Sequence, residues 1–151
     1  MTMDIKKQIA PLSILFAEDD ADDRFLFDKA LQEIDIPTRL TTVEDGELLM
    51  NYLSENDEFL PDILFLDLNM PRKNGYECLS EMKQNIKLKA IPVIVFTTSC
   101  PNDSIVMLFK VGAQDFVRKS GDFEQLKLVI HQALIRAIAK SALNEEDGGA
   151  L

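Results

Sequence analysis

The stretch Pro61 to Gly75, PDILFLDLNMPRKNG, decides the fold. Its residues 63–66 form an unbroken apolar run, which is typical of a strand buried on both faces, as in a parallel sheet. Asp67 comes where this strand should end, and the residues behind it predict a loop. Open α/β sheets bind ligands in the crevice at the carboxyl ends of their strands, so Asp67 is a candidate site residue. Asp is also favoured in turns, and this stretch alone leaves a turn-capping role for Asp67 equally open.

The composition narrows the class of protein. The chain has 151 residues, which predicts one domain, and 46% hydrophobic residues are enough to fill its core. The net charge of −10 argues against binding nucleic acid through phosphates or docking on an anionic membrane. No apolar run approaches the roughly 20 residues of a membrane-spanning helix, and the N-terminus lacks the apolar core of a signal peptide. Cys78 and Cys100 follow no metal-ligand spacing and predict reduced thiols in a cytoplasmic protein, while the single histidine, His131, is expected to be structural.

Hydrophobic patterns predict that strands and helices alternate along the chain. Expected strands cover 12–17, 39–43, 63–66, 93–96 and 115–118, and expected helices cover 25–34, 46–53, 75–84, 103–111 and 123–143. Asp22 or Asp23 is expected to cap the first helix. This order indicates an α/β fold with a five-stranded parallel sheet, right-handed crossovers and helices on both faces. We expect an N-terminal arm over 1–10, a domain over 11–143 and an acidic flexible tail over 144–151.

Chemically specific residues follow four of the five expected strands. In strand order they are Glu18 and Asp19, then Asp67, then Thr97 and Thr98, and finally Lys119. Because the carboxyl ends of parallel strands share one edge of a sheet, we expect these side chains to converge on one crevice. Three carboxylates there would repel one another, and hard oxygen ligands with room for water favour Mg²⁺ over zinc. Lys119 and Thr97 are suited to hold an anion beside that metal, which indicates phosphoryl transfer with Asp67 as the nucleophile.

Four islands of sequence, ILFAEDD, ILFLDLNMPRKNG, PVIVFTTS and GAQDFVRKS, resemble the receiver domain of two-component response regulators in order and spacing. The resemblance covers about residues 12–143 and implies a flavodoxin-like, doubly wound (βα)5 fold with strand order 2-1-3-4-5. It implies that Asp67 is the phosphoacceptor and that Asp19 and Asp67 bind Mg²⁺ directly. Glu18 would act on the metal through water, and Asn69 would contribute its backbone carbonyl.

The same resemblance implies how a phosphoryl group is held and sensed. Thr97, Lys119 and the backbone N–H of Thr98 would contact the phosphoryl oxygens, and Phe116 falls at the family's aromatic switch position. A histidine kinase or a phosphotransfer protein would donate the group. The surface of residues 103–143 would then bind a downstream protein or a second copy of the chain, because too few residues follow it for an effector domain. A weaker resemblance, in the acidic loop before the third strand and in the TTS run, is to stand-alone regulators that partner bacteriophytochromes.

One departure from the family and four alternatives bear on these expectations. The family usually has a cis Lys-Pro bond where this chain has Lys119-Ser120, and a non-proline cis bond costs about 2.5–4 kcal/mol, so a trans bond and a differently shaped loop are open here.

A phosphatase of the haloacid-dehalogenase type would need a second Asp at the position of Asn69, and a flavodoxin-like cofactor protein would need a phosphate loop where EDDADD stands. A salt-bridge cluster without chemistry would leave three acids facing one lysine. A module that binds without phosphorylation is disfavoured by the intact set of Asp67, Thr97 and Lys119.

Overall fold

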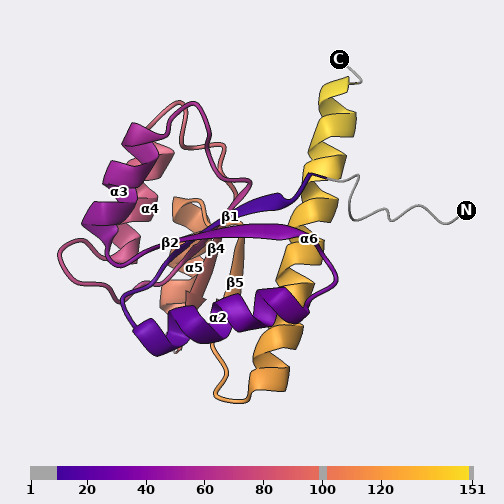
Figure 1. Cartoon of the computed structure of the whole chain (residues 1–151). Coiled ribbons are helices and arrows are strands. Elements are labelled where there is room, and N and C mark those ends of the chain that lie inside the picture. Colours follow the sequence, from indigo (N-terminus) through magenta and orange to yellow (C-terminus); the bar gives the residue numbers. More distant parts are fainter. Residues whose placement is uncertain (1–9, 99–101, 150–151) are drawn as a thin grey trace, which may run out of the picture.

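Alternating strands and helices make up the domain, as the hydrophobic pattern predicts. The computed structural model describes residues 10–98 and 102–149, and only the backbone of residues 145–149. In chain order the elements are β1 (Leu12–Ala17), α2 (Ala21–Glu33), β2 (Thr38–Val43), α3 (Gly46–Glu55), β3 (Ile63–Leu66), α4 (Gly75–Lys83), β4 (Val93–Thr97), α5 (Asn102–Val111), β5 (Asp115–Arg118) and α6 (Phe123–Gly149), as labelled in Figure 1.

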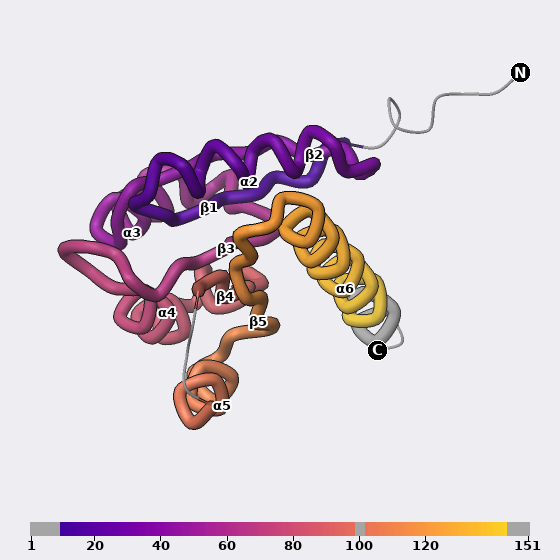
Figure 2. Tube along the Cα trace, turned by 90° about the horizontal axis from the view of Figure 1, so that it is seen from below, coloured from indigo at the N-terminus to yellow at the C-terminus, as the bar shows by residue number. Residues whose placement is uncertain are grey.

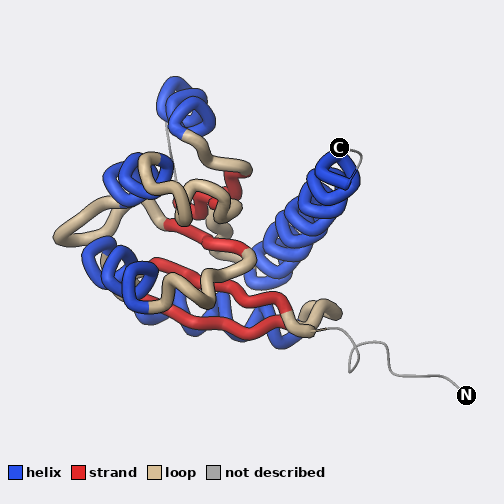
Figure 3. The backbone as a smooth tube through the Cα atoms, turned by 90° about the horizontal axis from the view of Figure 1, so that it is seen from above, coloured by secondary structure: helices blue, strands red, loops and turns tan. Residues whose placement is uncertain are grey.

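The five strands form one parallel sheet in the order β2-β1-β3-β4-β5. Helices α2 and α6 lie on one side of this sheet and α3, α4 and α5 on the other, as Figures 2 and 3 show from opposite ends of the molecule. Each side has its own buried apolar cluster. The predicted flavodoxin-like α/β fold with this strand order is therefore confirmed.

Four phenylalanine rings form the centre of the core between the sheet and α2. Phe27 of α2 stacks on Phe16 with ring centroids 4.1 Å apart and meets the edges of Phe65 at 4.9 Å and Phe96 at 5.6 Å. All four side chains are buried, and each aromatic pair adds about 0.5–1.5 kcal/mol beyond its area burial. Phe16 and Phe65 lie two residues before Glu18 and Asp67, and Phe96 directly precedes Thr97. The aromatic core therefore supports the strand ends where the polar residues lie.

Two helix ends differ from the prediction. Helix α2 begins at Ala21, a full turn earlier than expected, because Asp20 is its N-cap and accepts a hydrogen bond from the Asp23 N–H at 2.9 Å. The expected cap at Asp22 or Asp23 is wrong, since both residues lie in the first turn. Helix α6 continues to Gly149 instead of ending near residue 143, so residues 144–149, expected as a flexible tail, are helical. No proline interrupts this segment, and glycine comes only at its end.

Candidate functional site

The strand ends bring four polar side chains to one edge of the sheet. The Asp67 N–H donates to the Ala17 carbonyl at 3.1 Å, which sets the end of β3 beside the end of β1. The Lys119 N–H donates to the Thr97 carbonyl at 2.8 Å and sets β5 beside β4 in the same way. Glu18, Asp67 and Thr97 are buried there, and the Lys119 side chain is 11% exposed. The convergence expected from the strand order is thus present.

Glu18, Asp19 and Asp67 form an acidic cluster at this edge. One carboxylate oxygen of each lies within 4.8 Å of the other two. Asp19 is exposed, so the cluster is open to solvent on one side. Asp67 Oδ1 is buried and has no hydrogen-bond partner among the described residues, which is a costly arrangement for a carboxylate oxygen. Hard oxygen donors that face one another in this way, with one side open to water, fit a divalent cation such as Mg²⁺.

The Lys119 ammonium lies among three carboxylates. It forms an ion pair with Glu18 Oε1 and another with Asp23 Oδ2 at 2.9 Å, and its nitrogen is 3.6 Å from Asp67 Oδ2. The Phe96 ring lies beneath it, with its centroid 5.8 Å from the nitrogen. Burial alone would lower the pKa of Lys119, but the hydrogen bonds to Glu18 and Asp23 outweigh that effect and raise the pKa. Lys119 is therefore a stable positive charge beside Asp67.

Glu18 is the carboxylate that burial affects most. Burial raises the pKa of Glu18 to about 8; the hydrogen bond to Lys119 counteracts this rise, and the charge of Asp67 adds to it. The Asp20 N–H donates to Glu18 Oε2 at 3.2 Å and favours the charged form. The raised pKa of Lys119 is compatible with this shift, because Asp23 and Asp67 still face the ammonium when Glu18 is protonated. A further positive charge at the cluster would favour the ionised form of Glu18.

Thr97 and Phe116 lie on neighbouring strands. Thr97 Oγ1 is buried and has no hydrogen-bond partner within the described part of the chain. Thr98 is exposed, and residues 99–101 lie outside the described residues. Phe116 is half-buried and packs against the apolar cluster on the α3, α4 and α5 side of the sheet. Apolar side chains of that cluster therefore cover part of the Phe116 ring.

The loop after β3 closes back against the end of that strand. The Gly75 N–H donates to the Leu68 carbonyl at 3.0 Å, and Asn74 caps α4 through a capping box. A Cβ atom at Gly75 would lie 2.4 Å from the Asp67 carbonyl oxygen, so this close approach requires glycine. Asn69, whose carbonyl was expected to bind the metal, is exposed in the same loop. The loop therefore fixes the backbone of Asp67 from its C-terminal side.

Asp23 is a site residue that the sequence analysis missed. The acidic run that contains Asp23 suited the start of a helix, where the helix dipole favours acidic residues. Because α2 begins at Ala21, its first turn lies against the strand ends, and the Asp23 carboxylate reaches Lys119. The loop that carries Lys119 also differs from the family pattern, since the Lys119–Ser120 peptide bond is trans.

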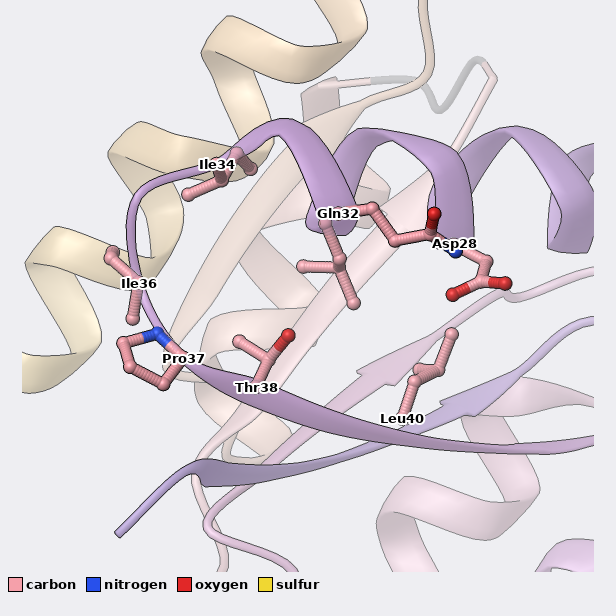
Figure 4. Close-up of a pocket in the computed structure, with 8 residues that line it drawn as sticks. Asp28, Gln32, Ile34, Ile36, Pro37, Thr38 and Leu40 are labelled. Carbon is pink, nitrogen blue, oxygen red and sulfur yellow. The ribbon is translucent and has the colours of Figure 1, made fainter. Parts of the chain in front are cut away.

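A separate pocket lies between the end of α2 and the beginning of β2 (Figure 4). Its volume is about 340 Å³, and its lining is Asp28, Leu31, Gln32, Ile34, Ile36, Pro37, Thr38 and Leu40. Within the described part of the chain, this lining contains none of the predicted site residues. A lone carboxylate among apolar, amide and hydroxyl side chains provides no pair of ionisable groups for catalysis, so the chemistry of this protein is better sought at the strand ends.

Other expectations concern the thiols, the histidine and membranes. Cys78 is a free, buried thiol, and burial raises its pKa to about 12, so it is unreactive at neutral pH. Cys100 lies outside the described residues. His131 is half-buried in α6. None of the helices in residues 10–98 and 102–149 combines the length and apolarity needed to cross a bilayer.

Comparisons with known proteins agree with this geometry. Residues 14–131 match the family described as "Response regulator receiver domain". Response regulator Rcp1 of Synechocystis sp. is 35% identical over 120 residues, which cover 77% of this chain and 82% of Rcp1. The crystal structure of the Mn²⁺-bound form of Rcp1 has a TM-score of 0.72 at 33% identity and covers 81% of this chain and 91% of that chain. The structure of the phosphorylated cyanobacterial phytochrome response regulator RcpA has a TM-score of 0.75 at 34% identity, with 82% and 91% covered.

Proposed function

This chain belongs to the response regulator receiver domain family, and we propose that its Asp67 accepts a phosphoryl group in a Mg²⁺-dependent reaction. The proposal rests on the environment of Asp67 Oδ1. This oxygen is buried without a hydrogen-bond partner among the described residues. Asp67 belongs to the cluster of three carboxylates, and its other carboxylate oxygen, Oδ2, lies 3.6 Å from the Lys119 ammonium. A phosphoryl group or a metal ion at this edge would provide the partner that the oxygen lacks.

In the proposed transfer, an Asp67 carboxylate oxygen forms a bond to phosphorus as the donor's bond to phosphorus breaks. The leaving group is the imidazole nitrogen of a phosphohistidine or the carboxylate of a small acyl phosphate, and it departs with the bonding electron pair. Bound Mg²⁺ would neutralise charge between the acidic cluster and the phosphoryl oxygens. Glu18, Asp19, Asp67 and the Asn69 carbonyl would hold it.

The remaining residues would position the phosphoryl group. The Lys119 ammonium, the Thr97 hydroxyl and the Thr98 backbone N–H would bind its oxygens, and charge-assisted hydrogen bonds of this kind are about twice as strong as neutral ones. Asn69 stands where a phosphatase of the haloacid-dehalogenase type would carry its second Asp. Rapid hydrolysis of the acyl phosphate therefore has no general base at that position, and we expect a long-lived aspartyl phosphate.

We propose that phosphorylation changes protein binding through Thr97 and Phe116. Thr97 Oγ1 has no hydrogen-bond partner in the described structure, so a phosphoryl oxygen within its reach would favour the phosphorylated arrangement. Phe116 has no hydroxyl, so its ring can move further inward without burying a polar atom. The surface of residues 103–143, to which Phe116 belongs, would bind a downstream protein or a second copy of the chain.

The proposed phosphodonor is a histidine kinase of the phytochrome type, or a phosphotransfer protein that such a kinase supplies. Membership of the receiver family implies a cognate histidine kinase. The similarity to RcpA, which is described as a cyanobacterial phytochrome response regulator, favours the phytochrome class. The initial rate of transfer from a phytochrome-type kinase should exceed the rate from an unrelated histidine kinase, and equal rates would contradict this assignment.

The test of the phosphoacceptor is incorporation of phosphate from acetyl phosphate, followed by intact-protein mass spectrometry. Wild-type protein should gain one phosphoryl group with Mg²⁺ and none with a chelator. Asp67→Asn keeps the shape of the side chain, removes the nucleophile and should gain none, whereas the exposed control Asp57→Asn should behave like wild type. Uptake by Asp67→Asn at the wild-type rate would refute the assignment. A pull-down that finds the same partners with and without phosphorylation would favour a module that binds unphosphorylated.

A further inference from the structure

The Lys119 ammonium has a second anchor on α2. Asp23 Oδ2 accepts a hydrogen bond from Lys119 Nζ at 2.9 Å across a sequence separation of 96 residues. Asp23 is not a member of the acidic cluster of Glu18, Asp19 and Asp67. Its carboxylate therefore contacts the positive charge of the site without belonging to the candidate metal ligands.

Asp23 is held rigidly for such a contact. Its backbone N–H donates to the Asp20 side chain at 2.9 Å, which is the capping bond of α2. The first turn of the helix is thereby fixed against the strand ends, and the Asp23 side chain is 35% exposed. A short side chain on a capped helix loses little freedom when it forms an ion pair.

Lys119 needs an anchor of this kind. A lysine side chain has about 2 kcal/mol of rotamer entropy, and its ammonium is a compact charge on a flexible stem. The backbone of Lys119 is fixed by the hydrogen bond to Thr97, and the hydroxyl of the next residue, Ser120, accepts a hydrogen bond from the Asp122 N–H. Glu18 also pairs with Lys119, but Glu18 is a candidate metal ligand and would be shared between Lys119 and the metal ion. Asp23 is the carboxylate in contact with Lys119 that the phosphoryl chemistry leaves free.

We propose that Asp23 is a positioning residue that holds the Lys119 ammonium beside Asp67 for phosphoryl transfer, an inference that rests on the proposed function of Asp67. In this role Asp23 touches neither the metal nor the phosphoryl group. It acts through Lys119, so its contribution should disappear when Lys119 cannot carry a charge.

The test compares Asp23→Asn with Asp22→Asn under acetyl phosphate, a donor too small to need a docking surface. Asp22 lies in the same first turn and is exposed, so its substitution removes the same charge from the helix end without touching Lys119. Asp23→Asn should slow phosphorylation roughly tenfold, within the ~100-fold that a misplacement of about 1 Å can cost. Asp22→Asn should keep the wild-type rate, and Asp23→Glu should recover part of the loss. A rate for Asp23→Asn equal to wild type would overturn the proposal, as would a faster rate, which would mean that Asp23 competes with the phosphoryl group for Lys119.

A double-mutant cycle separates this inference from the proposed function. Asp23→Asn and Lys119→Met are combined, and urea unfolding is measured without phosphodonor or metal. The effects of Asp23→Asn and Lys119→Met on the free energy of unfolding should not add up, because each single change breaks the same ion pair. The effects of Asp22→Asn and Lys119→Met should be additive. If the wild-type chain takes no label but the coupling is present, the phosphoacceptor assignment fails and the anchoring stands. If the chain takes label at Asp67 but the coupling is absent, the anchoring fails.

Discussion

We expect the stability of the metal-free domain to fall as the pH rises, because burial raises the pKa of Glu18. The pKa of Glu18 is raised from 4.5 to about 8. The folded state thus binds this proton more tightly than the unfolded state, so the stabilisation is fully present below about pH 4.5 and is lost as the pH rises through about 8. At about 1.4 kcal/mol per pKa unit, the loss across this window is roughly 5 kcal/mol. That is a large part of the roughly 5–15 kcal/mol by which domains are stable.

The measurement is urea unfolding of wild type and Glu18→Gln in metal-free buffer between pH 5 and pH 8. Glutamine cannot ionise, so the difference in unfolding free energy between the two proteins should shift by several kcal/mol toward the variant as the pH rises. Glu47→Gln removes an exposed carboxylate of α3 and should follow wild type. Saturating Mg²⁺ should make the unfolding free energy of wild type depend less steeply on pH, because a cation at the cluster favours ionised Glu18. A difference between wild type and Glu18→Gln that stays constant from pH 5 to pH 8 would refute the reasoning, and ¹³C NMR titration of the Glu18 carboxyl carbon gives an independent reading.

Two further substitutions test the switch and the loop. Thr97→Val replaces a buried hydroxyl that lacks a partner among the described residues. The free energy of unfolding of the unphosphorylated domain, measured with urea, should therefore stay the same or rise by up to about 1 kcal/mol. Phosphorylation-dependent binding should be lost. Binding that survives this change would exclude coupling between Thr97 and Phe116. Gly75→Ala would place a Cβ atom 2.4 Å from the Asp67 carbonyl oxygen, and we expect a loss of about 2 kcal/mol or more in thermal or urea unfolding together with slower phosphorylation. Wild-type stability and rate in Gly75→Ala would show that the loop does not fix Asp67.

The inner strands were predictable because burial on both faces produces unbroken apolar runs in the sequence, and the runs at 12–17 and 63–66 are strands in the structure with the same bounds. The edge strand 115–118 also has its predicted bounds, although only Val117 in it is fully buried. The ends of α2 and α6 were less predictable. Several neighbouring acidic residues could each cap α2, and acidic residues are also typical of a flexible tail such as the one expected after residue 143. Which of them caps α2 depends on where the chain leaves β1, and that is set by tertiary packing. The charge of residues 144–149 suggested a tail, although no residue before Gly148 stops a helix.

The acidic run EDDADD shows why side-chain partners need the three-dimensional structure. Glu18 and Asp19 face Asp67, which follows from their place at the end of a strand. Asp20 and Asp23 sit three residues apart on the same turn, yet Asp20 caps the helix while Asp23 turns its carboxylate toward Lys119. Sequence spacing cannot distinguish these roles, because both residues suit a helix N-terminus and the partner of Asp23 lies 96 residues away. If Asp23 does anchor Lys119, chains with a carboxylate at this position should tolerate loss of the proline after the lysine better than chains without one. Ser120→Pro should then restore phosphorylation in Asp23→Asn more than it changes wild type, and an equal effect in both backgrounds would contradict that expectation.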